Sequence, residues 1–310
     1  MEQKIIYEMP GLYRENFRVT GFTFGKGKKS MCILGNTRGN EYQQLYICSQ
    51  MVKKLKGLEE KGCIVPGHEI LVIPSANPYS INISKRFWPT DNTDINRMFP
   101  GYSLGETTQR IADGIFQKIQ DYTYGIQFTS FYMPGSFVPH VRMMKTNLEY
   151  TDKAAQFGLP YVVVRTPRPY DTTTLNYNWQ IWDALAFSVY SATTDTIDED
   201  SAEQVMDAMV NFMSKEGILS CAGYEGYHSR IISDDILISV RPTRSGLFQS
   251  EVRPGQKVLK GQPLADILNP YTGMIDERII SPSDGIIFFV HNHPLTYTHT
   301  AVFKLIPASP

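Results

Sequence analysis

Hydrophobic and polar positions follow two alternating patterns along the first two-thirds of the chain. Short apolar runs typical of buried strands lie at residues 29–36, 68–77, 125–132, 160–166 and 186–193. Longer stretches with apolar side chains every three or four positions predict helices over residues 41–62, 104–123 and 198–217. Strands that alternate with helices in this way indicate an α/β domain with a largely parallel or mixed sheet.

The pattern changes after about residue 235. Helical periodicity disappears, and short strand-like runs are separated by Pro-Gly, Lys-Gly, Thr-Gly and Asp-Gly turns. The sequence therefore predicts an α/β domain over residues 1–235 and a small all-β domain over residues 236–310, which is within the usual size range of a domain.

Composition narrows the classes of function. The formal net charge of −1 over 310 residues argues against binding to nucleic acid by phosphate neutralisation, and there is no polybasic segment for a membrane surface. The longest apolar runs are too short to span a bilayer. The N-terminal residues do not resemble a secretory signal, and the four cysteines are scattered without a CxxC pair. We expect a cytoplasmic protein with reduced thiols.

Charged side chains lie where an α/β fold binds its ligands. Arg38 and Glu41 follow the strand at 29–36 and precede a helix. Ligands of such sheets bind beyond the carboxyl ends of the strands. We therefore expect the turn at Arg38 and Glu41, the turn at Asn77 and the strand end at Thr129 to converge.

The arginine residues indicate the charge of the ligand, because a guanidinium binds a carboxylate with two hydrogen bonds. Arg38, Arg86, Asn96 and Arg97 together favour an anionic, amino-acid-like ligand. In the alternative interpretation the arginines form surface ion pairs with Asp91, Asp94 or Glu106.

Four motifs in order, GNTRGNE, IPSANP, TDINRMFPG and GETTQRIADGI, resemble the succinylglutamate desuccinylase/aspartoacylase family, a branch of the zinc carboxypeptidase superfamily. DINRMFPG is the most specific of them. The later stretches SGLFQSEVRPGQKVLKGQPLADI and ISPSDGII are similar to the C-terminal β domain of that family, a barrel-sandwich-like fold. The resemblance covers nearly the whole chain. It implies a carboxypeptidase-like mixed sheet of eight strands flanked by helices, and zinc-dependent hydrolysis of an acyl group from an amino-acid-like substrate.

The family's reacting residues are largely replaced in this sequence. The His-x-x-Glu zinc ligands of the family fall on Arg38 and Glu41, and its Asp-x-His falls on Gln127 and Thr129. Its general-base glutamate falls on Tyr190. Only Glu41 retains a metal-ligand type, since a guanidinium offers donors alone. The resemblance thus implies zinc as cofactor, but zinc that is not bound in the usual way.

Two functions remain open. The first is a hydrolase of the desuccinylase/aspartoacylase type, which cleaves the amide bond of a small N-acyl amino acid with a degenerate zinc site and Tyr190 in the position of the base. The alternative is a non-catalytic pseudoenzyme that binds an amino-acid-like carboxylate, with the positive charge of Arg38 partly replacing that of the metal. In both, the expected substrate-binding residues are Arg38, Arg86, Asn96, Arg97, Gln127, Thr129 and His140. Neither function involves nucleic acid or a membrane, and the oligomeric state is left open.

Histidines offer further candidates. We expect His140 in a loop after the strand that ends at Thr129, where it borders the cleft or joins Glu41 in an unorthodox metal site. His291, His293 and His299 lie in a turn-like segment of the β domain, where surface positions are expected rather than a metal site.

Overall fold

The computed structural model describes residues 1–11, 15–221, 223 and 225–308, and the chain divides into two compact units. The first comprises residues 1–130, 139–191 and 195–232. The second comprises residues 131–138, 192–194 and 233–310, so it takes two short segments from the middle of the chain as well as the C-terminal segment.

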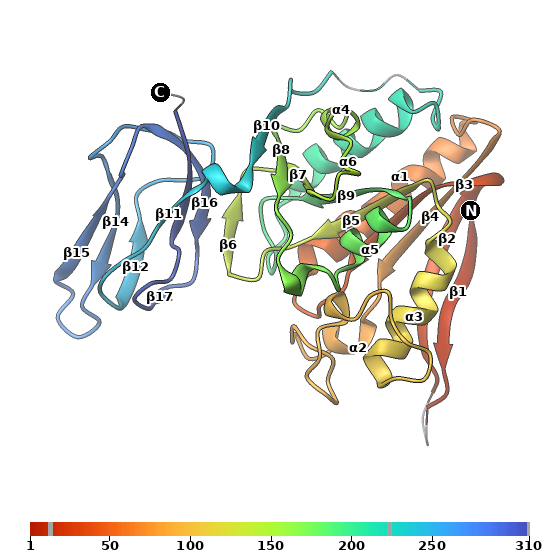
Figure 1. Ribbon diagram of the computed structural model, residues 1–310, viewed down its shortest axis with the longest axis horizontal. Coiled ribbons are helices and arrows are strands. Elements are labelled where there is room, and N and C mark those ends of the chain that lie inside the picture. Colours follow the sequence, from red (N-terminus) through yellow and green to blue (C-terminus); the bar gives the residue numbers. More distant parts are fainter. Residues whose placement is uncertain (12–14, 222, 224, 309–310) are drawn as a thin grey trace. The chain divides into compact units, whose positions relative to one another are not determined.

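A mixed sheet of nine strands forms the centre of the first unit (Figure 1). In spatial order its strands are β1 (Glu2–Met9), β2 (Phe17–Gly25), β4 (Gly67–Ser75), β3 (Gly27–Asn36), β5 (Tyr124–Thr129), β9 (Leu185–Tyr190), β7 (His140–Met144), β8 (Tyr161–Arg165) and β10 (Arg230–Ser233). The strands β4, β3, β5 and β9 run parallel, whereas β7 is antiparallel to β9. The predicted α/β class with a mixed sheet is confirmed, with one strand more than the resemblance implied.

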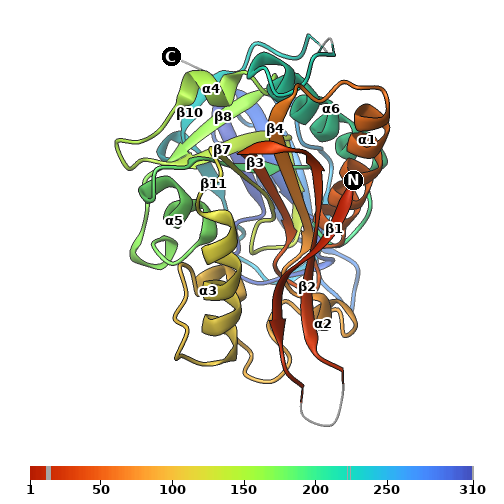
Figure 2. The same cartoon turned by 90° about the vertical axis from the view of Figure 1, so that its right-hand side faces the viewer.

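Helices cover both faces of this sheet. They are α1 (Tyr42–Glu60), α2 (Pro78–Ile81), α3 (Thr107–Ile119), α4 (Thr151–Ala155), α5 (Leu175–Ile181) and α6 (Glu199–Lys215), with 3-10 turns at Ile95–Arg97 and Pro169–Asp171. Figure 2 shows α1 and α6 on one face and α3 and α5 on the other. None of the helices among the described residues is long and apolar enough to cross a bilayer.

The spacing of apolar side chains explains these positions. Ile47, Met51 and Leu55 are fully buried along one side of α1, and Ile111 and Ile115 are fully buried along α3. Each such side chain contributes about 1.5–3 kcal/mol by leaving water. The two faces of the sheet therefore carry separate apolar cores.

Two sheets make up the second unit. One contains β11 (Ile238–Val240), β18 (Phe303–Pro307), β16 (Gly285–His291), β13 (Lys257–Val258) and β6 (Gly135–Phe137), which pairs with β16. The other contains β15 (Ile275–Ile280), β14 (Pro263–Leu268), β12 (Gly246–Ser250) and β17 (Leu295–Thr296). A third 3-10 turn lies at Asp234–Ile236. The predicted C-terminal all-β character is confirmed.

The structure corrects two expectations about histidines. His140 is not in a loop but begins β7, where it is fully buried. His291 is not on the surface: it ends β16, is 5% exposed, and its ring lies 5.8 Å from that of Phe248. In both cases strand pairing with distant segments buries a side chain that the local sequence placed in a loop or at the surface.

Candidate functional site

The carboxylate of Glu41 accepts five hydrogen bonds in the turn between β3 and α1. Its Oε2 accepts from the backbone N–H groups of Thr37 and Arg38, at 2.8 and 2.9 Å, and from the Thr37 hydroxyl at 3.1 Å. Its Oε1 accepts from Ser130 Oγ at 2.6 Å and from Arg38 Nη1 at 3.0 Å. Glu41 is fully buried, so protein donors replace the water that would otherwise solvate its charge.

Arg38 connects Glu41 to a second carboxylate. Arg38 Nε donates to Asp94 Oδ2 at 3.0 Å, and Arg86 Nη2 donates to the same oxygen at 3.2 Å. Burial alone would lower the pKa of Arg38, but Asp94 and Glu41 outweigh it and raise that pKa above its usual value. Burial opposes ionisation of Asp94 as well, yet Arg38 and Arg86 hold its pKa below the ordinary range. Two guanidiniums and two carboxylates thus form a charge-balanced cluster.

This cluster refines the alternative interpretation of the arginines. Arg38 and Arg86 do pair with Asp94, as that alternative allowed. The pairing is not on the surface, however, since Arg38 and Asp94 are 4% and 7% exposed. The segment that follows Asn77 lies against this turn, since the backbone N–H of Gly39 donates to the Lys85 carbonyl at 3.0 Å.

Asparagines hold the turn in place. The Asn36 side chain donates to the Glu41 carbonyl at 3.4 Å and accepts from Ser75 Oγ at 2.8 Å. Asn77 Nδ2 donates to the Thr37 carbonyl at 3.3 Å. The predicted convergence of the turn at Asn77 with that at Arg38 and Glu41 is therefore confirmed.

Gln127 and Asn96 extend the cluster across the sheet. Gln127 Nε2 donates to Asn96 Oδ1 at 3.1 Å, and the Asn96 backbone N–H donates to Asp94 Oδ1 at 3.0 Å. Both side chains are buried. Thr129, two residues further along β5, is 6% exposed, and its carbonyl accepts from Gln44 Nε2 at 3.3 Å.

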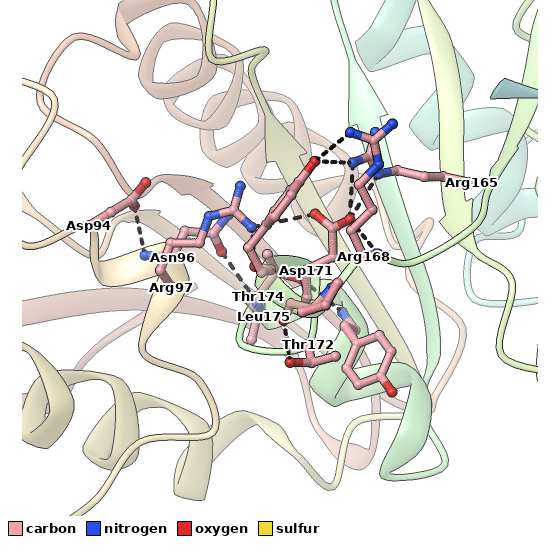
Figure 3. A network of polar contacts seen from close by, with 12 residues as sticks. Asp94, Asn96, Arg97, Arg165, Arg168, Asp171, Thr172, Thr174 and Leu175 are labelled. Atoms are coloured by element: carbon pink, nitrogen blue, oxygen red, sulfur yellow. Dashed lines mark hydrogen bonds and ion pairs between the residues drawn. The ribbon is translucent and has the colours of Figure 1, made fainter. Parts of the chain in front are cut away.

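Arg97 belongs to a different group of side chains, centred on Asp171 (Figure 3). Arg97 Nη1 lies 3.5 Å from Asp171 Oδ1 and donates to the Tyr170 carbonyl at 2.5 Å. Arg165 donates to Asp171 Oδ2 from Nε and Nη2, at 3.1 and 3.0 Å, and the backbone N–H of Arg168 donates to the same oxygen at 3.0 Å. Two guanidiniums, those of Arg97 and Arg165, and the backbone N–H of Arg168 therefore contact one carboxylate, in contrast to the balanced cluster at Arg38.

Tyr190 and His140 lie side by side at the ends of neighbouring strands. They are opposite each other in the β7–β9 pairing, and their rings stack with centroids 4.6 Å apart and planes 8° apart. Arg142 joins this stacked pair and was not identified from the sequence: its guanidinium carbon lies 4.6 Å from the Tyr190 ring centroid. Its Nη2 lies 3.4 Å from His140 Nε2. Alternation along His140–Met144 was the available signal, since positions 140 and 142 share a face of β7.

The groups around Glu41 can be compared with the ligands that a catalytic zinc requires. A catalytic zinc takes three protein ligands drawn from imidazole, thiolate and carboxylate groups. Within the part of the chain that the structure describes, no three His, Cys, Asp or Glu side chains gather closely enough to hold a metal ion. The groups nearest the Glu41 carboxylate are the Arg38 guanidinium, two hydroxyls and two backbone N–H groups.

Comparison with known proteins places the chain in a family. Residues 27–214 match the family model described as the succinylglutamate desuccinylase/aspartoacylase catalytic domain. A curated relative, the N-alpha-acetyl-L-2,4-diaminobutyric acid deacetylase of Halomonas elongata, is 26% identical over 95 residues; the match spans 31% of this chain and 26% of the relative's length.

Solved structures show the same fold over almost the whole chain. A succinylglutamate desuccinylase from Silicibacter sp. TM1040 superposes with a TM-score of 0.82 at 17% identity, covering 98% of this chain and 94% of that one. The product-bound ectoine utilization protein EutE (DoeB) from Ruegeria pomeroyi gives 0.81 at 18% identity, with 98% and 94% coverage. With a catalytic-domain match over more than half of its length, this chain belongs to the succinylglutamate desuccinylase/aspartoacylase family.

Proposed function

We propose that this chain binds a small amino-acid-like carboxylate ligand at the strand ends of its α/β unit, and that it does so without the zinc-dependent hydrolysis implied by the resemblance. The observation that carries the proposal is the fully engaged carboxylate of Glu41. Its two oxygens already accept five hydrogen bonds, including one from Arg38 Nη1 at 3.0 Å, so protein donors occupy the positions that a metal would need.

Zinc does not fit the residues that are present. A dication beside Glu41 would lie next to the guanidinium of Arg38, which stays protonated and cannot become a ligand. Binding it would also break a buried network whose charges are balanced, which is costly in a medium of low polarity. Thr129 and Gln127 stand where the resemblance places an imidazole and its carboxylate, and neither supplies the missing ligand.

Relatives support the class of ligand. The curated relative is named as a deacetylase of N-alpha-acetyl-L-2,4-diaminobutyric acid, and the family model takes its name from succinylglutamate and from aspartoacylase. Such compounds carry at least one carboxylate, which arginine recognises well. Arg97 is the better placed of the expected arginines, because it is 29% exposed and shares one carboxylate with the guanidinium of Arg165, whereas Arg38 and Arg86 are neutralised by Asp94 and Glu41.

Family membership supports a second function, hydrolysis of the amide bond of a small N-acyl amino acid. In that case Tyr190 would stand in the position of the base, although a phenol is a poor proton acceptor near neutral pH. We place either function in the cytoplasm, as the sequence led us to expect.

Calorimetric titration combined with an amine-release assay tests the proposal. Protein purified without chelator is titrated with N-acetyl-L-2,4-diaminobutyrate and with N-succinyl-L-glutamate, and the same mixtures are assayed for free amine with and without added zinc. We expect saturable binding of at least one compound, weakened by Arg97→Gln and unaffected by the control Arg278→Gln, with no amine released. Zinc-dependent release that disappears in Glu41→Gln would overturn the non-catalytic account and establish the hydrolase.

A further inference from the structure

Arg142 is a buried cation in the middle of β7. The residue is 5% exposed, and its Nε has no hydrogen-bond partner among the residues that the structure describes. Within the described part of the chain its guanidinium contacts the ring of Tyr190 at 4.6 Å and His140 Nε2 at 3.4 Å. Both contacts are with aromatic rings, and neither brings a full negative charge to the guanidinium.

Other buried or half-buried arginines of this unit have carboxylate partners. Arg38 lies 3.0 Å from both Glu41 and Asp94, and Arg165 lies 3.0 Å from Asp171. Among the described residues, no ion pair joins Arg142 to a carboxylate. A charge removed from water without a partner is costly, and proteins keep such groups paired or place them where a ligand completes them.

Strand register shows what surrounds the guanidinium. Arg142 lies opposite Ser188 on β9, and Ser188 in turn lies opposite Gln127 on β5, so the three share one face of the sheet. His140, Tyr190 and Thr129 form the next row on that face. All these neighbours are uncharged or weakly basic. Ser188, Tyr190 and Thr129 are buried, with exposed fractions of 6%, 8% and 6%.

The residue type at position 190 determines whether Arg142 has a negatively charged partner. It stands where the resemblance places a glutamate, and a carboxylate there would lie within reach of Arg142, whose guanidinium carbon is 4.6 Å from the tyrosine ring centroid. With tyrosine at position 190, the guanidinium keeps a cation–π contact but receives no neutralising charge. An anion from outside the chain can supply that charge.

We propose that Arg142 binds one carboxylate group of a small organic anion, held on the sheet face between Ser188 and Tyr190. The contacts with Tyr190 and His140 fix the plane of the guanidinium, which leaves its other N–H groups available for the carboxylate. The identification of that anion with an amino-acid-like ligand rests on the proposed function; the carboxylate site itself does not.

A thermal-melting series with acetate tests the site directly. Sodium acetate replaces sodium chloride at constant ionic strength, and acetamide serves as the uncharged probe of the same shape. We expect the melting temperature of the wild-type protein to rise saturably with acetate and to stay unchanged with acetamide. In Arg142→Met the rise should be absent, and the melting temperature without acetate should equal or exceed that of the wild type, because an unpaired charge has been removed.

Two further variants keep the test decisive. Tyr190→Glu supplies the missing charge from within the chain, so it should also abolish the acetate response. Arg278→Met is the matched control, since Arg278 pairs with Asp266 at 2.9 Å in the second unit, and it should retain the full response. The proposal is overturned if Arg142→Met and the wild type respond equally, or if Tyr190→Glu leaves the acetate response intact.

Titration with N-acetyl-L-2,4-diaminobutyrate and N-succinyl-L-glutamate separates the two proposals. If acetate acts through Arg142 but neither compound binds, the carboxylate site stands and the amino-acid part of the proposed function fails. If either compound binds wild type and Arg142→Met with equal affinity, the proposed function stands and the role of Arg142 is refuted. If both proposals hold, Arg142→Met should weaken binding at least tenfold.

Discussion

Arg38 Nη1 lies 3.0 Å from Glu41 Oε1, and the two side chains are 4% and 0% exposed. An ion pair thus occupies the turn where the family resemblance places the first two zinc ligands. Because Asp94 and Arg86 complete a balanced cluster around this pair, each charge depends on its partners for solvation. The consequences for stability, pH dependence and metal binding can all be measured.

Removing the charge of Glu41 should destabilise the protein strongly. Glu41→Gln leaves Arg38 with one carboxylate instead of two and places an amide N–H near the hydroxyl of Ser130, which now donates to Glu41 at 2.6 Å. Loss of one partner from a buried pair costs roughly 3 kcal/mol of unfolding free energy. Urea denaturation measures the loss. The matched control is Glu8→Gln, which removes a surface pair with Arg18 and should change stability far less. Equal effects of the two substitutions would contradict the buried network.

Acid should weaken the same cluster through Asp94. Its pKa in the folded protein is lowered because Arg38 and Arg86 outweigh the effect of burial. A lowered pKa means that the carboxylate stabilises the fold above the usual aspartate pKa of about 4, and that this stability is lost as the pH falls through the folded-state value. Asp94→Asn should therefore be less stable than wild type at pH 7, and the gap should narrow below about pH 4. A gap that stays constant between pH 7 and pH 3 would refute this assignment.

Restoring the ligand types should create a metal site. The triple variant Arg38→His, Gln127→Asp and Thr129→His supplies two imidazoles beside Glu41 and a carboxylate to orient one of them. We expect it to bind about one zinc per chain, measured by metal analysis after dialysis, and to melt at a higher temperature with zinc than without. The same variant with Glu41→Ala should lose the metal. Failure of the triple variant to bind zinc would show that the turn does not occupy the position of the family's ligands.

Close packing beneath the turn gives a prediction about Gly39. A Cβ at this position would lie 2.1 Å from the Ser80 carbonyl oxygen and 2.4 Å from that of Lys85. Gly39→Ala must displace the backbone of Ser80 and Lys85, and should lower the free energy of unfolding by more than about 2 kcal/mol. Gly57→Ala in α1 is the matched control, since its Cβ would meet nothing within 4 Å and alanine favours helix by about 0.5–1 kcal/mol. Thermal melting of both variants measures these effects. An unchanged melting temperature in Gly39→Ala would contradict the close packing of the turn against Ser80 and Lys85.

Sequence patterns predicted the parts of the fold that depend on neighbours along the chain. The helix expected at residues 198–217 is α6 (Glu199–Lys215), because Asp198 caps its first turn by accepting from the Ser201 N–H at 3.0 Å. Apolar periodicity and end signals of this kind are local.

The environments of Arg142 and Arg97 depend instead on contacts between segments far apart in the sequence. Arg142 was not singled out from the sequence, and the placement of β7 beside β9 buries it against Tyr190. Arg97 was expected with Arg38, but it pairs with Asp171, 74 residues away. Charge partners so far apart in sequence leave no local signal, whereas the turn at Arg38 and Glu41 was identified because its strand and helix adjoin it directly.

Metal analysis of the wild-type protein tests the central claim most directly. The protein is purified without chelator, incubated with zinc, dialysed, and its metal content is compared with that of Glu41→Gln. An ion pair in place of the metal predicts far less than one zinc per chain in both samples. Stoichiometric zinc that is present in the wild type and lost in Glu41→Gln would contradict it.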